Sequence, residues 1–398
     1  SYPVQNACMI LLSRYGTFFV YTNRNIVDYQ QELVKPAFVV TYRNVVGLED
    51  YWSYTAFSGD KTAGYINNYN GNLVFSAFDT AFNSGINGFT VSHIYNSCNT
   101  TADYGSKTAV KYGNGWSVNM IQRLQPVSID GNESVKYAYT DGDGTRHYLV
   151  QTENGSIVDE DGLGYTYSDI SEGELIRKLT DKDGNVFKFD QWGYLRIIID
   201  TNQNTISLNY SPIAYVDNFI SSITTSSGGN FVFNYDTNHR LMNIVDNAGR
   251  TQSFEYTGDN LTKITYPDGS VQQFGYSENG KMTEVINADG SRFSLAYDAQ
   301  LRVVSINEYG TGNSAGIAKS FKYDINQSVV TDNKNRSMTY QFDTFGRTTC
   351  IYDNLNNSYS QNYTPTSNSR NGIFSNNKIS VSSNNIKYVD NLISNGSF

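Results

Sequence analysis

A repeat of about twenty residues runs through the second half of the sequence. An aromatic residue followed by Asp or another polar residue recurs from Phe189-Asp190 to Phe342-Asp343, mostly at intervals of 20 or 21 residues. The recurring aromatic positions are Phe189, Tyr210, Tyr235, Tyr256, Tyr276, Tyr297, Tyr323 and Phe342. Repetition at such a period is typical of stacked supersecondary units. The sequence therefore constrains the architecture before it constrains any chemistry.

Inside one repeat, aromatic residues alternate with polar ones. The stretch GNFVFNYD places Phe231, Phe233 and Tyr235 on one face, and SRFSLAYD does the same with Phe293 and Tyr297. Alternation with period two predicts a strand with one buried face. The aromatic residues that we expect to hold this face together are Phe189, Tyr210, Phe231, Phe233, Tyr235, Phe254, Tyr256, Phe274, Tyr276, Phe293, Tyr297, Tyr323 and Phe342.

Glycines mark the ends of the strand pairs. Gly184, Gly269 and Gly290 follow Asp, and Gly249 follows Ala at the equivalent place. Asp-Gly between alternating strands predicts a type I′ hairpin turn, in which both central residues take positive φ. Each repeat is therefore expected to be a β-hairpin that another tight turn joins to the next.

The number of hairpins predicts how the sheet is shaped. Eight hairpins would give roughly sixteen strands, about 77 Å across at ~4.8 Å per strand. Open sheets rarely exceed ~10 strands without curling or splitting. We therefore expect an all-β fold in which repeated hairpins form a curved or spiralling ribbon, with its aromatic face inward and its edges covered by the terminal segments.

The stretches FNYDTNHRLMNIVDNAGR, LAYDAQLRVVSI and YQFDTFGRTTCIYD resemble the YD repeats of the bacterial RHS proteins, over roughly residues 141 to 353. Upstream, GYINNYNGNLVFSAFDT is similar to the segment that leads into such repeats in large secreted and surface proteins. KPAFVVTYRN resembles the last strand of a DNRLRE-type β-sandwich domain. The resemblance implies a β-shell, which in this family often encapsulates a C-terminal toxin or acts in adhesion, outside the cell or at the cell wall.

One feature of the family is missing. Complete RHS cores end in an Asp-Pro-containing stretch associated with self-cleavage before the cargo, and none of the six prolines here follows Asp. We therefore expect this sequence to be part of a shell, with the cleavage element, the cargo and any signal peptide outside it.

Four regions are predicted along the chain. Residues 1–48 are interpreted as the tail of a preceding β-sandwich-like domain or as lead-in strands, and residues 49–140 as a β lead-in or plug over one edge of the sheet. Residues 141–353 hold the repeats. Residues 354–398 are Asn- and Ser-rich and are interpreted as a linker with the start of a following module.

Charge and composition disfavour several classes of partner. The formal net charge is −9 and no run of Lys or Arg occurs, so a nucleic-acid surface is disfavoured. No stretch approaches the ~20 apolar residues of a membrane span. Cys8, Cys98 and Cys350 lie far apart and are odd in number, which favours buried or unpaired thiols.

Candidate metal ligands fit turns better than they fit a metal site. Asp181, Asp183 and Asn185 imitate the first ligands of a calcium loop, but Trp192 stands at the twelfth position, where a bidentate Glu is needed. The stretch DGDG at 141–144 offers two carboxylates without a completed loop. No metal ligand and no cofactor is predicted.

No catalytic residue is predicted either. Asp159, Glu160 and Asp161 sit together in a turn, whereas a glycosidase needs two carboxyl groups ~5 to 10 Å apart on either side of a sugar. The three histidines show no ligand spacing and no nucleophile motif, and we expect structural or surface roles for them: His93, His147 and His239.

Two functional hypotheses follow, with an enzyme ranked third. The first is a non-enzymatic wall segment that encloses or presents a C-terminal cargo such as a toxin, its partner being the protein's own downstream domain. The alternative is an extracellular adhesin that binds cell-wall or cell-surface glycans or proteins through exposed aromatic rings. Because most Tyr and Phe fall on the buried face and only three Trp are present, the first hypothesis leads.

Overall fold

We analysed a computed structural model of the chain. The residues that it describes are 8–12, 17–22, 39–41, 47–49, 52–86, 89–99, 112–128, 134–159, 163–213, 216–343, 346–355, 357–360, 380–383 and 386–390. The chain divides into two compact units, Ser1–Val46 and Gly47–Phe398. The domain limits at 48, 140 and 353 that the sequence suggested remain predictions.

The first unit holds a small antiparallel sheet in the order β1-β2-β3. Its strands are β1 (Cys8–Leu12), β2 (Thr17–Thr22) and β3 (Val39–Thr41).

The second unit begins with a five-stranded antiparallel sheet, here called the inner sheet. Its strands follow one another in sequence and in space: β4 (Tyr54–Gly59), β5 (Thr62–Asn67), β6 (Leu73–Ile86), β7 (Phe89–Asn96) and β8 (Trp116–Val118). A 3-10 turn, η2 (Ser97–Asn99), follows β7.

The rest of the unit is one continuous antiparallel sheet, here called the wall, in which successive strands pair from β9 to β33. Its first part comprises β9 (Arg123–Pro126), β10 (Val135–Thr140), β11 (Arg146–Gln151), β12 (Ile157–Asp159), β13 (Thr166–Glu172), β14 (Leu175–Thr180), β15 (Val186–Asp190), β16 (Leu195–Ile199), β17 (Thr205–Ile213) and β18 (Val216–Thr225). The hairpins of the strict repeat follow as β19 (Asn230–Tyr235), β20 (Leu241–Asp246), β21 (Thr251–Thr257), β22 (Asn260–Thr265), β23 (Val271–Tyr276), β24 (Met282–Ile286), β25 (Arg292–Tyr297) and β26 (Val303–Tyr309). After η3 (Thr311–Asn313) come β27 (Ala315–Asp324), β28 (Gln327–Asp332), β29 (Ser337–Phe342), β30 (Thr348–Asp353), β31 (Ser358–Ser360), β32 (Ser380–Ser383) and β33 (Ile386–Asp390). The prediction of an all-β ribbon of repeated hairpins is confirmed, and pairing continues into the Asn- and Ser-rich segment through β31, β32 and β33.

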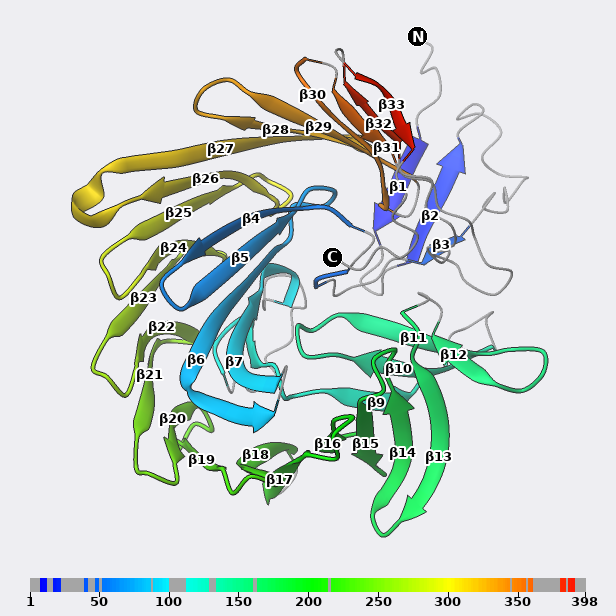
Figure 1. The fold of residues 1–398 in the computed structure, drawn as a ribbon, viewed down its shortest axis with the longest axis vertical. Coiled ribbons are helices and arrows are strands. Elements are labelled where there is room, and N and C mark those ends of the chain that lie inside the picture. Colours follow the sequence, from blue (N-terminus) through cyan, green and yellow to red (C-terminus); the bar gives the residue numbers. More distant parts are fainter. Residues whose placement is uncertain are drawn as a thin grey trace, which may run out of the picture. The chain divides into compact units, whose positions relative to one another are not determined.

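The wall curves around the inner sheet, with β4 to β7 lying on the concave side of the hairpins β19 to β30 (Figure 1). At its beginning it also folds back on itself. Leu124 of β9 donates its backbone N–H to the Gly193 carbonyl at 2.9 Å, and Leu195 donates to Gln122 at 3.2 Å. Open sheets of more than ~10 strands rarely stay flat, and this longer sheet curls.

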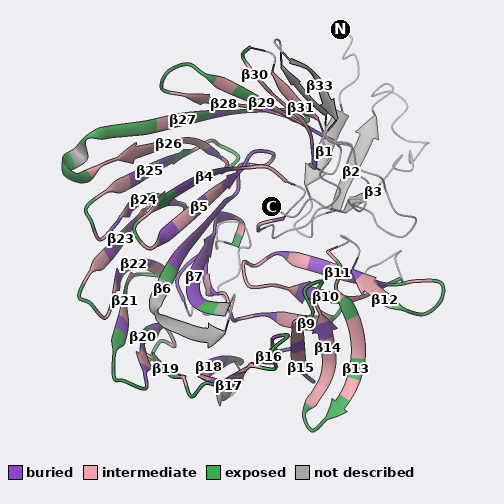
Figure 2. Cartoon of the chain, viewed as in Figure 1, coloured by how far each residue is buried: buried purple, intermediate pink, exposed green. Residues whose placement is uncertain are grey.

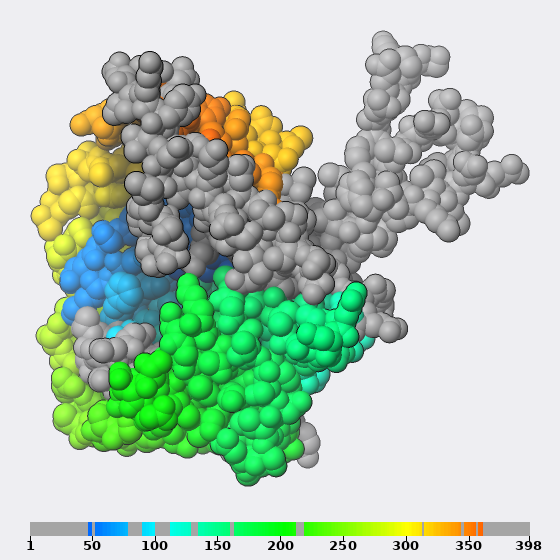
Figure 3. Space-filling view, turned by 45° about the vertical axis from the view of Figure 1, so that its right-hand side comes forward, coloured from blue at the N-terminus to red at the C-terminus, as the bar shows by residue number. Residues whose placement is uncertain are grey.

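Buried residues lie along β4 to β7 and within the strands of the wall, while many of the wall's turns are exposed (Figure 2). Strand β19 shows the alternation, since Phe231 and Phe233 are buried and Val232 between them is exposed. In space-filling view, the blue residues of the inner sheet appear between the yellow and green parts of the wall (Figure 3). The sequence had placed residues 49–140 over an edge of the sheet. Instead, β4 to β8 cover its inner face, because they supply a second apolar surface for the aromatic rows.

Within the described part of the chain, none of the helical segments is long and apolar enough to cross a membrane.

Candidate functional site: the turns and tyrosine ladder of the wall

In most of the repeats an Asp opens a five-residue turn. In the turn from Asp246 to Arg250, the backbone N–H of Asp246 donates to the Arg250 carbonyl at 3.1 Å, and that of Gly249 donates to the Asp246 carbonyl at 3.0 Å. Oδ1 of Asp246 also accepts hydrogen bonds from the backbone N–H groups of Ala248 and Arg250, at 2.9 and 2.8 Å. The Asp side chain thus satisfies two donors that the tight turn would otherwise leave open. Equivalent pairs are made by Asp181, Asp190, Asp200, Asp236, Asp298, Asp332 and Asp353.

The predicted type I′ geometry of these turns is wrong. Gly184, Gly249, Gly269 and Gly290 have positive φ, between 77° and 87°, but the residue before each does not. With one left-handed residue at the fourth position, the turn is a type I turn closed by a glycine bulge. The physical reason lies in the first residue of the turn. Its side chain or backbone carbonyl accepts hydrogen bonds that hold the next two residues in a right-handed turn, so only the fourth residue must be left-handed.

The second oxygen of the Asp carboxylate binds the residue that closes the turn. Oδ2 of Asp236 accepts from Nε of Arg240 at 2.9 Å, and Oδ2 of Asp246 lies 2.6 Å from Nη2 of Arg250. The same pairing occurs in three later turns: Asp298 with Arg302, Asp332 with Arg336, and Asp343 with Arg347. Burial acts to raise the pKa of Asp246, but hydrogen bonds from Arg250 and from the turn backbone outweigh it and lower that pKa.

Each repeat tyrosine reaches back to the preceding hairpin. The hydroxyl of Tyr256 donates to the Leu241 carbonyl at 2.8 Å, and that of Tyr235 donates to the Ile220 carbonyl at 2.8 Å. Both pairs are 15 residues apart in sequence. The other members of this tyrosine ladder are Tyr210 with Leu195, Tyr276 with Leu261, Tyr297 with Met282, and Tyr323 with Val303. Burial raises the pKa of Tyr256 above its ordinary value, so the hydroxyl remains a donor.

A shift in pairing register places these tyrosines. It falls just before Tyr235, Tyr256, Tyr276 and Tyr297 in their strands. Such a bulge bends the strand and redirects the side chain. The rings are therefore half-buried, whereas the residues two positions earlier, three phenylalanines and Leu295, are fully buried. The sequence placed both residue types on one face, but it gave no signal for the hydroxyl–carbonyl contact.

All the predicted aromatic residues lie on the inner side of the wall. The buried ones are Phe189, Phe231, Phe233, Phe254, Phe274, Phe293 and Phe342, and the half-buried ones are Tyr210, Tyr235, Tyr256, Tyr276, Tyr297 and Tyr323. The structure does not gather them into one pocket; it spreads them in rows along the ribbon, as a wall requires.

The inner sheet binds these rows through aromatic packing. Phe57 of β4 packs on Phe293 with ring centroids 4.9 Å apart, and Trp116 of β8 packs on Phe274 at 4.8 Å. Nε1 of Trp116 donates to the Tyr276 hydroxyl at 2.8 Å. At these distances, tilted rings gain stabilisation beyond their buried area.

Polar contacts fix the inner sheet at both rims of the wall. Nζ of Lys61 binds Oδ2 of Asp268 at 2.7 Å, at the turn between β22 and β23. Nζ of the buried Lys281 donates to the Ser97 carbonyl at 2.5 Å. The sequence gave no reason to single out either lysine, because each contact joins residues about 200 positions apart.

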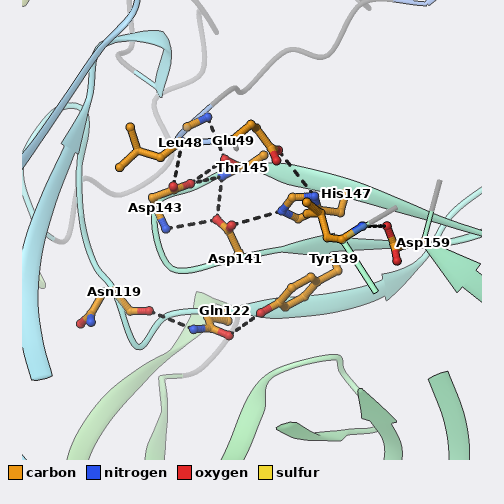
Figure 4. Close-up of polar contacts among 12 residues, drawn as sticks. Leu48, Glu49, Asn119, Gln122, Tyr139, Asp141, Asp143, Thr145, His147 and Asp159 are labelled. Atoms are coloured by element: carbon orange, nitrogen blue, oxygen red, sulfur yellow. Dashed lines mark hydrogen bonds and ion pairs between the residues drawn. The ribbon is translucent and has the colours of Figure 1, made fainter. Parts of the chain in front are cut away.

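A buried polar cluster surrounds the turn between β10 and β11 (Figure 4). Oδ2 of Asp143 accepts from the Leu48 backbone N–H at 2.8 Å, and Oδ2 of Asp141 lies 3.1 Å from Nε2 of His147. Nδ1 of His147 lies 3.6 Å from Oε1 of Glu49. The cluster therefore fastens residues 47–49 to the wall.

The two carboxyl groups of this cluster have opposite pKa shifts. Burial and the neighbouring Asp141 raise the pKa of Asp143 well above its usual value. Burial works in the same direction on Asp141, but the hydrogen bond and charge of His147 outweigh it and lower that pKa. The two shifts in opposite directions reduce the repulsion between the two carboxyl groups, because they need not both be charged.

The calcium-like residues also serve turns. Oδ1 of Asp181 accepts from the backbone N–H groups of Asp183 and Asn185, at 2.9 and 2.8 Å. Asp159 accepts from the backbone of Leu163, Gly164 and Tyr165. Among the described residues, no group of three or more His, Cys, Asp and Glu side chains could hold a metal ion.

The histidines lie in three different environments. His239 occupies the left-handed position of a repeat turn, with φ of 64°, where Gln203 and Asn335 stand in other copies. His147 belongs to the buried cluster, and His93 is buried between the inner sheet and the wall.

Comparisons with known proteins identify the repeat. A family model described as "Teneurin YD-shell" matches residues 218–397. Two curated relatives are the tRNA3(Ser)-specific nuclease WapA of Bacillus spizizenii and the tRNA nuclease WapA of Bacillus subtilis strain 168. Each is 22% identical over 347 residues, which cover 70% of this chain. The chain spans 14% of the length of each relative.

The structural similarities listed for the chain are distant. The crystal structure of TcdB2-TccC3-TEV matches 83% of this chain and 22% of that chain, at 10% identity and a TM-score of 0.31. TcdB2-TccC3 without its hypervariable C-terminal region matches 84% and 20%, at 9% identity and a TM-score of 0.30. The family likeness therefore rests on the family model and on the YD repeat, whose Tyr links hairpins and whose Asp opens turns. Residues 218–397 of this chain are therefore similar to a YD-shell, the architecture that the YD repeat of the sequence also resembles.

Proposed function

We propose that this chain is a non-enzymatic wall segment of a large secreted RHS-type protein and that the wall encloses or presents a C-terminal cargo such as a toxin. The YD-shell fold is structural, and the functional groups of the repeat are engaged in holding it together. The Asp carboxylates bind turn backbone and the Tyr hydroxyls bind carbonyls of the preceding hairpin. The proposal places the protein outside the cell or at the cell wall.

The observation that carries the proposal is the continuity of the wall. Successive strands pair without interruption from β9 to β31, and the tyrosine ladder adds a bond between neighbouring hairpins. A sheet without gaps between its strands is a barrier to proteases and solvent. The inner sheet covers the aromatic rows, so the barrier does not depend on cargo to bury its apolar face.

The names of the relatives suggest a class of cargo. Both WapA proteins are named tRNA nucleases, and this chain matches only a small part of their length. We infer that a nuclease is the first cargo to look for in the complete polypeptide. The net charge of −9 on this segment suits a wall that should not itself bind RNA.

Protease protection tests enclosure. The complete polypeptide encoded by the parent gene is treated with proteinase K, and the lifetime of any segment after Phe398 is compared with that of the same segment expressed alone. We expect protection in the complete protein, and faster cleavage in Phe233→Ala, which opens the buried face of β19. Val232→Ala changes the exposed neighbour on the same strand and serves as the matched control. Equal cleavage of the enclosed and isolated segments would contradict the proposal.

The second candidate function, an adhesin for glycans or proteins, rests on one residue. Trp192 is 54% exposed on the turn between β15 and β16, and an exposed indole is a common stacking surface for sugars. The repeat aromatics are buried or half-buried, which disfavours a broad aromatic binding face. Glycan-array binding that Trp192→Ala abolishes would favour this function over enclosure.

A further inference from the structure

His93 lies at the centre of the contact between the inner sheet and the wall. It sits on β7, where it pairs with Ala77 of β6 and Val118 of β8. Its ring faces Phe254 of β21, with ring centroids 4.4 Å apart. The side chain is buried, with 1% of the residue exposed. An imidazole therefore occupies a position that most sheet interfaces fill with an apolar residue.

Neither ring nitrogen of His93 has a hydrogen-bond partner among the described residues. The nearest strand neighbours on its face, Ala77 and Val118, offer no polar side-chain atom. Across the interface, Gln252 of β21 is also buried and its Oε1 has no partner. The contact thus contains polar groups that are removed from water without full compensation.

The charged groups on the packed elements do not compensate a charge on His93. Glu255 of β21 and Lys263 of β22 pair with each other at 2.7 Å on the outer face. The nearby tyrosine hydroxyls have other partners, since Tyr256 of β21 donates to the Leu241 carbonyl and Tyr95 of β7 accepts from the Met282 backbone N–H. The side chain of Asp79 on β6 lies outside the described residues.

We propose that His93 makes the attachment of the inner sheet to the wall sensitive to acid, so that a falling pH favours release of the inner sheet. If His93 were protonated between Phe254, Ala77 and Val118, its positive charge would be removed from water, which disfavours protonation in the packed state. Once β7 separates from β21, water can solvate the same charge. Protons therefore bind preferentially to the released state.

The direction of the pH effect follows from burial. Burial lowers the pKa of His93 to about 3, whereas a solvated histidine has a pKa of about 6.5. A group with a lowered pKa in the packed state contributes stability above its solvated pKa and loses it as pH falls toward the packed value. The equilibrium constant for release should rise about tenfold per pH unit below about pH 6.5, because one proton is taken up.

The second buried histidine provides an internal comparison. His147 lies between Oδ2 of Asp141 at 3.1 Å and Oε1 of Glu49 at 3.6 Å. Two carboxyl groups therefore surround His147, whereas His93 has apolar neighbours. The turn carboxylates titrate below about pH 4 when solvated. Because burial raises the pKa of Asp143 and of Glu308, the His93 variants, and not the pH interval alone, assign the effect to His93.

Amide hydrogen exchange on the full chain tests the proposal. Protection factors of β7 and β8 are compared with those of β23 and β24 between pH 7 and pH 4.5, for the wild type, His93→Gln, His93→Leu and His147→Gln. We expect opening of β7 and β8 to increase about tenfold per pH unit in the wild type and in His147→Gln, while β23 and β24 stay protected. We expect neither His93 variant to show this dependence.

Three results would overturn the proposal: no acid dependence in the wild type, the same dependence in the His93 variants, or simultaneous opening of β7 and β23. If His93→Leu fails to fold, His93→Gln alone decides, because its side chain is neutral and polar like the imidazole. The inference uses the wall and inner sheet of the proposed function but no cargo. A negative hydrogen-exchange result would leave the proposal of cargo protection untouched. A negative protease-protection result would likewise leave the exchange result unchanged.

Discussion

At the fourth position of the repeat turns, the backbone is left-handed whichever residue is present. Gly249 has φ of 77° with nothing within 4 Å of an added Cβ, and Gln203 has φ of 66° in an exposed turn. Because the surroundings impose no clash, the backbone conformation alone should decide the effect of substitution there.

Substitutions at these two turns should act in opposite directions. We expect Gly249→Ala to lower the free energy of unfolding by about 1 kcal/mol, since a side chain in this region costs ~1–2 kcal/mol. Gln203→Gly should raise it by roughly 0.5 kcal/mol, the gain being reduced by the entropy of glycine in the unfolded chain. Urea denaturation of both variants is the measurement. Changes of the same sign would show that φ is not the cause.

The Asp at the first position has two separable roles, acceptor and anion. Asp246→Ala should lower the free energy of unfolding by about 1–2 kcal/mol, because two turn N–H groups lose their acceptor. Asp246→Asn should cost less, since its Oδ1 can accept the same bonds, and the Arg250 guanidinium is too exposed for its ion pair to add much.

Acid provides the check on Asp246. Its pKa is lowered in the folded protein, so its contribution is present above the unfolded value of about 3.9 and lost as pH falls through the folded value. Denaturation curves of the wild type and Asp246→Asn should therefore converge in acid. A constant difference at every pH would assign the effect to packing.

Between elements, the tyrosine ladder should contribute one hydrogen bond per repeat. Tyr256→Phe removes the donor to the Leu241 carbonyl and should lower the free energy of unfolding by about 1 kcal/mol. Tyr352→Phe is the matched control, because the Tyr352 hydroxyl makes no hydrogen bond to the described residues and its ring is also half-buried. Thermal unfolding of the two variants distinguishes the bond from general loss of a hydroxyl.

The buried row of β19 should be more sensitive than the ladder. Phe233→Ala is expected to lower the free energy of unfolding by roughly 3–5 kcal/mol, since it leaves a cavity under the inner sheet. Val232→Ala on the same strand should cost less than about 1 kcal/mol, because its side chain is exposed. Similar losses at both positions in denaturant titrations would contradict the assignment of faces.

The hairpins could be predicted from sequence and the inner sheet could not. Alternation around Phe231 and Phe233 and the spacing of the Asp residues are local signals. The contact of Phe57 with Phe293 joins distant segments, and the sequence around either residue gives no signal that predicts the other as its partner. The turn type was missed because Asp-Gly was interpreted as two central residues, whereas Asp246 acts from the first position.

Over the whole molecule, stability should be graded along the wall. Strands β21 to β26 bind the inner sheet through Phe254, Phe274 and Phe293. Strands β13 and β27 expose much of their length. Repeat architectures have local stabilities that need not unfold together. We expect native-state hydrogen exchange to be slowest in β21 to β26 and fastest in β13 and β27. A single opening free energy for every strand would indicate one cooperative unit.

The tyrosine ladder also gives the ribbon a direction. Every ladder hydroxyl binds a carbonyl that lies earlier in the chain, 15 residues back for Tyr235 and 20 for Tyr323. A chain synthesised or exported with its N-terminus first presents each acceptor before the tyrosine that will bind it. We therefore expect the hairpins to join the ribbon in chain order, each on the hairpin before it. If the wall encloses a cargo, as we propose, a cargo encoded after the last hairpin would reach a wall that is already complete.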